Sequence, residues 1–388
     1  MKLSGVLLGL LSLGIVACDA PATSTSTTAT SAAPQLVASA APEIAAAGSG
    51  SAEAREAPLV GGAPSASAAL APTAGGAGAA PVAGGAPTAA PVDESLAVQG
   101  VLPAGVADKV LKAGEPPKVV LLSAGAEPRE TLSYLLEPGV KQTTVMSMDM
   151  TMSMAPEGAA VPQKAELPTI EMALDLSSGA KDPSGDIAIT GVVGGIGIVA
   201  KPGPQEQLKG MLEPALAGIK GLSINYKVSP KGRARDVKVS MPANAPANAQ
   251  QMMEQMKQSF ESMVAPLPDE AIGVGAEWQV VTRVSTGADI LQWTNYKLVS
   301  RNGKNIELSA VVKQLAASGV LSGGQLPPGV TAEVLAFRSN GTGSSSVELS
   351  QLAPSKGTGD VRSSITVSGG GQKMSIDTEV RIAFGPKK

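Results

Sequence analysis

Thr144-Val-Met-Ser-Met-Asp-Met-Thr-Met-Ser-Met154 is the stretch that decides the fold. Methionine occupies every second position from Met146 to Met154, and the positions between are small or acidic. Because successive side chains of a strand point to opposite faces, this alternation makes one apolar row and one polar row. The pattern predicts an antiparallel strand with one face buried and the other in water.

The same alternation recurs along most of the chain downstream. Ile170, Met172 and Leu174 alternate with Glu171 and Asp175, and short runs rich in Gly, Ser and Asn separate such segments. Strands at this spacing with short turns are typical of a meandering antiparallel sheet. We expect further strands around residues 187–189 and at 222–228, 236–241, 278–284, 290–299, 305–312, 331–338, 345–352, 361–368 and 374–384.

Helices are few in the predicted fold. Apolar residues have helical spacing in Gln250–Val264 and, more weakly, in Gln205–Ile219, and a short helix is expected over residues 104–113. The sequence therefore predicts a mainly β (α+β) domain over residues 99–388. It is either a large curved antiparallel sheet or a two-layer sheet, with two or three packed helices.

The N-terminus carries the pattern of an exported lipoprotein. Lys2 precedes an apolar run that ends in Leu13-Gly-Ile-Val-Ala-Cys18. The run is about fifteen residues, short of the roughly 20 needed to span a bilayer, which argues against a retained transmembrane helix. We predict a signal peptide at residues 1–17. Its end resembles the bacterial lipobox, which implies cleavage before Cys18 and acylation of the cysteine sulfur and its new amino group.

Residues 18–98 are predicted to form a disordered tether. They are mostly Ala, Pro, Gly, Ser and Thr, with few charges and no aromatic residue. Such a composition does not bury enough apolar surface to offset the entropy of ordering. A random coil of this length has a typical reach of roughly 50 Å, enough to hold a folded domain clear of a membrane. We interpret the tether as a spacer rather than a recognition segment.

Two absences exclude whole classes of function. The chain has no histidine, and its one cysteine is the predicted lipid-attachment site. Ser-His-Asp and Cys-His catalysis, zinc–thiolate sites and disulfides are therefore not available. A net charge of −3 and 2% aromatic residues argue against a nucleic-acid surface. We expect no enzymatic activity, no cofactor and no metal site.

The methionine row is the sharpest local candidate for a site, and it admits three interpretations. Methionine is an adaptable filler of irregular cores, which is the interpretation that we favour. Thioethers also hold Cu(I), but neither Cys nor His joins the row. The third interpretation is an apolar-ligand cavity lined by Met146, Met148, Met150 and Met152.

Other partial motifs are interpreted as chance matches. Gly195-x-Gly197-x-x-Ala200 fits a dinucleotide fingerprint by letter, but Lys201-Pro-Gly-Pro204 follows where a helix should open. Ser178-x-x-Lys181 matches the penicillin-binding motif, yet it falls in an expected turn and has no companion motifs. Six carboxylates on the polar phase of strands are expected to be solvated rather than catalytic: Asp149, Glu171, Asp175, Asp236, Asp377 and Glu379.

Two later motifs carry a resemblance to a known family. Ser229-Pro-Lys-Gly232 lies at the turn of a predicted hairpin, and Leu267-Pro-Asp-Glu-Ala-Ile-Gly-Val-Gly-Ala-Glu-Trp278 leads into the later strands. Their order resembles a family of uncharacterised bacterial lipoproteins, a domain of unknown function with a Ser-Pro-x-Gly hairpin and a Val-Gly-x-x-Trp motif. The resemblance would cover roughly residues 130–385. It implies an exported lipoprotein and no specific activity.

The sequence thus favours a membrane-anchored envelope lipoprotein with a non-catalytic structural or interaction role. The alternative is a carrier or sensor of an apolar ligand, such as a lipid, held by the curved sheet. The expected partners are a membrane, through Cys18, and an unknown envelope protein or apolar ligand. The anchor is expected in the inner or outer membrane, with the domain facing the periplasm or the cell surface.

Overall fold

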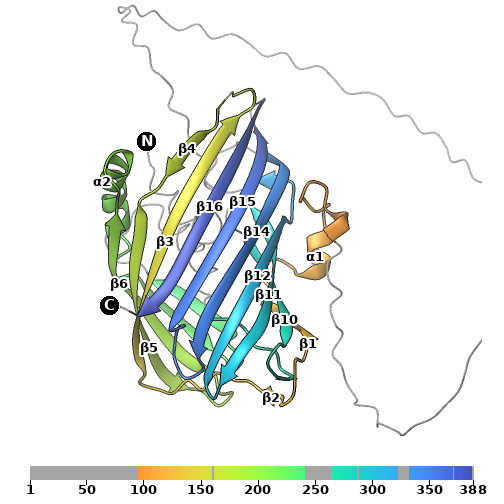
Figure 1. Ribbon diagram of the computed structural model, residues 1–388, viewed down its shortest axis with the longest axis vertical. Coiled ribbons are helices and arrows are strands. Elements are labelled where there is room, and N and C mark those ends of the chain that lie inside the picture. The colour runs from red at the N-terminus through yellow and green to blue at the C-terminus, as the bar shows by residue number, and fades with distance from the viewer. Residues whose placement is uncertain are drawn as a thin grey trace, which may run out of the picture. The chain divides into compact units, whose positions relative to one another are not determined.

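The computed structural model describes residues 94–159, 161–240, 264–285, 288–321, 332–369 and 371–386. These residues form mainly β structure, dominated by one 14-stranded antiparallel sheet (Figure 1). The strands are β1 (Lys118–Ser123), β2 (Glu130–Thr131), β3 (Lys141–Pro156), β4 (Gln163–Glu166), β5 (Thr169–Lys181), β6 (Ile187–Val199), β7 (Ser223–Val228), β8 (Ala234–Ser240), β9 (Ala271–Ile272), β10 (Glu277–Ser285), β11 (Asp289–Asn302), β12 (Asn305–Ala316), β13 (Val320–Leu321), β14 (Ala332–Glu348), β15 (Lys356–Gly369) and β16 (Gln372–Pro386).

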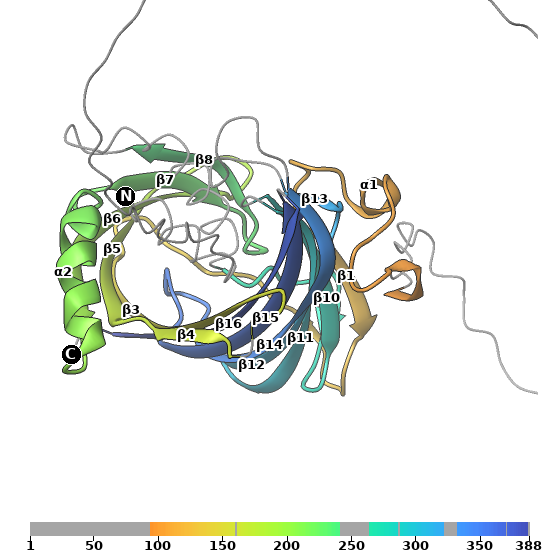
Figure 2. The ribbon, with the colours of Figure 1, turned by 90° about the horizontal axis from the view of Figure 1, so that it is seen from above.

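The large sheet is a meander with two long-range pairings, β1 with β10 and β16 with β3. Its order is β1-β10-β11-β12-β14-β15-β16-β3-β5-β6-β7-β8, with β13 on β14 and β4 on β3, while β2 and β9 pair separately. The pairing of β16 with β3 joins the C-terminal half of the domain to its N-terminal half. The sheet curls so that one face is concave (Figure 2). Of the two predicted arrangements, the single curved sheet is therefore the one that forms.

The main core lies on the concave face, as the period-two pattern predicts. On β3 the even-numbered residues point inward, and Met148, Met150 and Met152 are buried. Met148 and Met150 are directly opposite Ile382 and Val380 of β16. The odd-numbered residues of β3 face outward, so the methionines and the small or acidic residues between them occupy opposite faces of one strand.

Helices are minor elements in the described part of the chain. α2 (Pro204–Ala217) confirms the weaker helix prediction, and Pro204 at its first turn suits the fixed φ of proline. α1 (Val106–Val110) confirms the short helix, and a single 3₁₀ turn spans Glu94–Leu96. Among these elements, none has the length and apolar character of a membrane-crossing helix. The predicted helix at Gln250–Val264 falls outside the described residues, except for Val264.

α1 packs on the outer face of the sheet. It closes a second, smaller core whose largest members are Leu111, Leu291 and Trp293. Arg283 of β10 forms ion pairs with Asp108 of the helix and with Asp289, the latter at 2.6 Å between Nη2 and Oδ2. Because this guanidinium is largely buried and paired on two sides, it fixes the helix against β10 and β11.

One prediction about strand boundaries was wrong. The segments 331–338 and 345–352 were expected as two strands, with a turn at the Gly- and Ser-rich residues between them. The structure has the single strand β14 instead, which runs through that region without a turn. Gly341 and Gly343 lie inside the ladder, opposite Val361 and Gly359 of β15. These glycines are therefore inner-face residues of a strand, and the chain turns only after Glu348.

Candidate functional site

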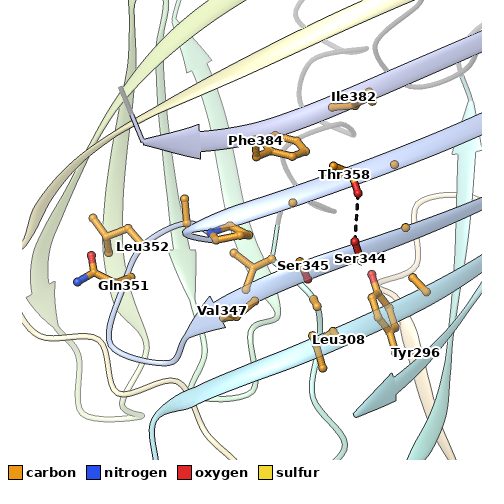
Figure 3. A pocket seen from close by; sticks show the side chains of 18 of the residues that line it. Tyr296, Leu308, Ser344, Ser345, Val347, Gln351, Leu352, Thr358, Ile382 and Phe384 are labelled. Atoms are coloured by element: carbon orange, nitrogen blue, oxygen red, sulfur yellow. Dashed lines mark hydrogen bonds between the residues drawn. The ribbon is translucent and has the colours of Figure 1, made fainter. Parts of the chain in front are cut away.

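An apolar cavity of about 200 Å³ opens on the concave face (Figure 3). Its wall comes from five neighbouring strands, β11, β12, β14, β15 and β16, and from the loop that joins β14 to β15. Tyr134 and Ala265 border it from outside the large sheet. The side chains that give the cavity its apolar character are Tyr296, Leu308, Ala310, Val347, Leu352, Ile382 and Phe384.

Three glycines make room for this cavity. Gly343 of β14 lies opposite Gly359 of β15, and Gly357 lies two residues before Gly359 on the same face. A Cβ atom placed on Gly359 would meet nothing closer than the backbone oxygen of Thr342, at 3.9 Å. The space therefore exists because adjacent inner-face positions carry no side chain, and not because the strands separate.

The side chain of Gln142 contributes to holding the β14–β15 loop over the cavity. Gln142, on the inner face of β3, accepts hydrogen bonds at Oε1 from the amides of Leu352 (2.8 Å) and Ala353 (3.0 Å). Its Nε2 donates to the carbonyl oxygen of Ala353 at 3.1 Å. These three hydrogen bonds join the loop to β3. They also satisfy backbone amide and carbonyl groups of the loop that water does not freely reach.

The two sequence motifs behind the family resemblance meet beside this cavity. In the Ser229–Gly232 turn, the Pro230 carbonyl accepts from the Tyr134 amide at 2.7 Å, and Lys231 Nζ donates to the carbonyl of Pro268 at 3.0 Å. Gly232 has φ +75°, and a Cβ atom there would lie 2.6 Å from the Tyr134 ring. Both observations explain why the turn requires glycine at this position.

The stretch 265–268 is fixed in place by three side chains, which we call the hub: Tyr134, Lys231 and Trp278. Tyr134 donates its hydroxyl to the Ala265 carbonyl at 3.0 Å, and the Trp278 indole Nε1 donates to the Pro266 carbonyl at 2.8 Å. Burial lowers the pKa of the Lys231 ammonium, which also donates to the Leu132 carbonyl at 2.8 Å. The hub thus holds residues 265–268 in place at the edge of the cavity.

Burial raises the pKa of every tyrosine in the protein. Tyr296 stacks on Trp278 with ring centroids 5.6 Å apart, and burial raises its pKa to about 12. Burial raises the pKa of Tyr134 and of Tyr226 as well, and the neighbouring Tyr296 adds to the effect at Tyr134. These three are the only tyrosines of the chain.

This arrangement predicts a pH dependence of stability at alkaline pH. In the unfolded chain the tyrosines ionise near pH 10, whereas folded Tyr296 keeps its proton up to about pH 12. Above pH 10 the unfolded state has therefore lost protons that the folded state retains, so stability falls as the pH rises through this range. In a spectrophotometric titration, phenolate absorbance should appear together with the loss of β-sheet circular dichroism. If a tyrosine ionised near pH 10 while the chain remained folded, the predicted link between tyrosine ionisation and unfolding would be contradicted.

The four methionines proposed as ligand-lining residues lie next to the cavity and not in its wall. Met148, Met150 and Met152 are buried in the main core, and Met146 is half-buried against it. The lining residues Ile382 and Phe384 are the register partners of Met148 and Met146. The lining role of the methionines therefore stays a prediction.

The remaining sequence candidates that the structure describes lie apart from the cavity. Cys18 and most of residues 18–98 are outside the described residues. Ser178 lies within β5 rather than in the expected turn, and its hydroxyl donates to the Glu137 carbonyl at 2.5 Å. Gly195 and Gly197 lie within β6. The six carboxylates are on the outer face or at exposed strand positions, and Arg362 holds the pKa of Glu379 below its usual range.

The cavity residues that sequence reasoning missed are mainly glycines. Glycine in a single strand carries no side chain whose phase can be read. Gly343 falls outside the strands expected at 331–338 and 345–352, and Gly357 and Gly359 fall before the one expected at 361–368. Their combined effect depends on the pairing of β14 with β15. Within the described residues, no group of three or more His, Cys, Asp or Glu side chains is placed to hold a metal ion.

Comparisons with known proteins add little to this picture. No family model and no curated protein matches the chain. One matching solved structure is described as "CymD monoaromatic hydrocarbon channel", with 8% sequence identity and a TM-score of 0.21. The match covers 65% of this chain and 89% of that chain. A likeness this remote assigns no function.

Proposed function

We propose that the protein is a lipid-anchored envelope protein whose folded domain binds an apolar ligand in the cavity on its concave face. The observation that carries the proposal is the cavity itself, which has mostly apolar walls and three inner-face glycines that make room for it. Cavities of roughly 150 Å³ lined by apolar side chains bind benzene-sized molecules. A volume of about 200 Å³ therefore accommodates a single apolar ring or a segment of an alkyl chain.

The proposed role is binding, as a carrier or sensor, without catalysis. The described wall residues supply apolar contacts and a few hydroxyl and amide groups, and none of their side chains is charged. Chemistry on a bound molecule would require a charged or nucleophilic group placed against it. A mostly apolar cavity with few polar groups instead favours retention of an apolar molecule.

Anchoring is proposed from Cys18 and the segment before it. The lipobox-like sequence implies a diacylated and N-acylated cysteine, and more than one acyl chain is what stable attachment to a membrane requires. With the roughly 50 Å reach of the tether, the domain would stay near the inner or outer membrane without entering it. A ligand that partitions into that membrane would then be available at high local concentration.

Cys18→Ser tests the anchor. We expect the variant to lose acylation completely, because the serine hydroxyl does not take the place of the thiol in lipid transfer. In cells labelled with a fatty-acid probe, wild type should carry label and fractionate with membranes. The variant should carry none and keep its signal peptide. Label on Cys18→Ser would contradict the lipoprotein proposal.

Native mass spectrometry of the Cys18→Ser chain tests the ligand. Without its own acyl groups, the chain should retain a small apolar molecule from the producing cells, or take up an added one such as an alkylbenzene, with one copy bound. The matched sample is the same chain with the cavity blocked, as described in the Discussion. Equal uptake by the open and blocked chains would contradict binding at the cavity.

A further inference from the structure

A row of neutral polar side chains crosses the concave face in a place where apolar residues would be expected. It follows the strand register from β10 to β16, so each member lies directly opposite the next. We call it the polar row, and its members are Thr282, Gln292, Gln314, Ser339, Ser363 and Thr378. Polar groups buried on a core face lower stability unless they have partners, so such a row requires an explanation.

Hydrogen bonds connect the centre of the polar row. Ser339 donates its hydroxyl to Gln314 Oε1 at 2.5 Å, and Gln314 Nε2 donates to Gln292 Oε1 at 2.7 Å. Gln292 Nε2 in turn donates to the hydroxyl of Thr294 at 3.3 Å. The central members therefore satisfy one another and hold their side chains in fixed orientations.

The two ends of the polar row are different. The hydroxyl groups of Thr282 and Thr378 have no hydrogen-bond partner among the described residues, although both oxygen atoms are inaccessible to solvent. Thr378 is only 3% exposed and points to the concave face, in register with Met152. A buried hydroxyl without a partner is unfavourable by about 1–3 kcal/mol, so Thr378 is a donor held in place without an acceptor.

The polar row lies at a defined distance from the apolar cavity. Thr378 is four residues from Ile382 along β16, and Ser339 is four residues from Gly343 along β14. At about 3.4 Å per residue, the two sites are about 14 Å apart on the same face. Between them the inner-face residues Val312 and Val361 are only half-buried, so apolar surface connects the cavity to the row.

We propose that the concave face binds a linear amphiphile with a neutral hydrogen-bond acceptor, such as the carbonyl of an ester. Its apolar end would occupy the cavity, its chain would lie along Val312 and Val361, and its carbonyl oxygen would accept from the Thr378 hydroxyl. The polar row contains no charged side chain, so a carboxylate there would be buried without a counter-charge. This inference rests on the proposed function and names the class of ligand.

Matched probes test the inference on the full chain carrying Cys18→Ser. Methyl dodecanoate has the acceptor, dodecane lacks it, and both compete with an environment-sensitive naphthylamine dye for the site. The wild-type concave face should bind the ester about two- to tenfold more tightly than the alkane, which is the effect of one hydrogen bond. Dodecanoate, as an anion, should bind more weakly than the ester.

Three threonine variants identify the donor. Thr378→Val replaces the hydroxyl by a methyl group and should make the ester and alkane affinities equal, with the alkane affinity unchanged. Thr378→Ser retains the hydroxyl and should keep the preference. Thr342→Val, at an exposed position on the outer face of β14, is the control and should also keep it. Because Thr378→Val removes an unpaired buried hydroxyl, its thermal midpoint should be unchanged or higher by a few degrees.

The outcomes separate the two proposals. Equal binding of ester and alkane by the wild-type chain would overturn the inference and leave the proposed function intact. If Thr378→Val still preferred the ester, the inference would likewise be overturned and the proposed function would remain. If neither probe displaces the dye, the proposed function fails and the inference fails with it. If Thr378→Val does not fold, the ester preference of the wild type and of Thr378→Ser still decides whether a neutral acceptor is recognised.

Discussion

Replacing Trp278 by alanine is expected to lower the free energy of unfolding by about 3–5 kcal/mol. Trp278 is fully buried, stacks on Tyr296 and donates its indole Nε1–H to the Pro266 carbonyl. The substitution leaves a large void at the hub, removes the stacked ring and leaves a buried carbonyl without its donor. Urea denaturation followed by circular dichroism measures the loss as a shift of the midpoint with little change in slope.

Two smaller substitutions separate packing from hydrogen bonding at the hub. Trp278→Phe retains an aromatic ring and should be considerably less destabilising than alanine. Tyr134→Phe removes only the hydroxyl that donates to the Ala265 carbonyl, and about 1 kcal/mol is expected. Because Tyr296, which stacks on Trp278, lines the cavity, Trp278→Ala should also weaken apolar binding. Less than about 1 kcal/mol of destabilisation for Trp278→Ala would show that the hub does not support the fold.

Gly359→Leu is expected to abolish apolar binding while the domain remains folded. A Cβ atom at Gly359 meets no close neighbour, and its direction leads into the cavity of about 200 Å³. A leucine side chain would occupy the space that the ligand needs, so dye and alkylbenzene affinity should fall by at least about tenfold. Burial of the new side chain should leave stability unchanged or raise it by about 1 kcal/mol.

The matched control is Gly195→Leu. Gly195 lies within β6, away from the cavity, and no atom lies within 4 Å of a Cβ atom placed there. The same substitution in another strand should therefore leave binding unchanged. Loss of binding in both variants would indicate a general effect of leucine on the sheet. Normal binding by Gly359→Leu would show that the ligand, if one binds, occupies another part of the concave face.

Sequence periodicity predicted the strands well where side chains alternate clearly. The Met146–Met154 row and the alternating segment that became β5 have the inner and outer faces that their patterns predict. The hairpin at Ser229–Gly232 and the weaker helix were also confirmed. The prediction failed at Gly341 and Gly343, because glycine marks a turn in one context and a strand without a side chain in another.

The cavity and the polar row were not predictable in the same way. Each is made from residues on several strands, and the chain contains no local signal that places Gly359 opposite Gly343, or Thr378 opposite Ser363. Gln142 closes the site by contacting residues more than 200 positions away. Such a contact is decided by register and curvature, which depend on all the strands together.

By itself, the sequence determined the side-chain phase of the clearest strands and excluded histidine and thiol chemistry in the domain. These are local properties, set by alternation within one strand or by composition. Only the tertiary structure decided that the single sheet curls, that β16 pairs with β3, and that three glycines meet on the concave face. The physical reason is that side-chain direction repeats every two residues within a strand, whereas a cavity forms only where separate strands bring small residues into register.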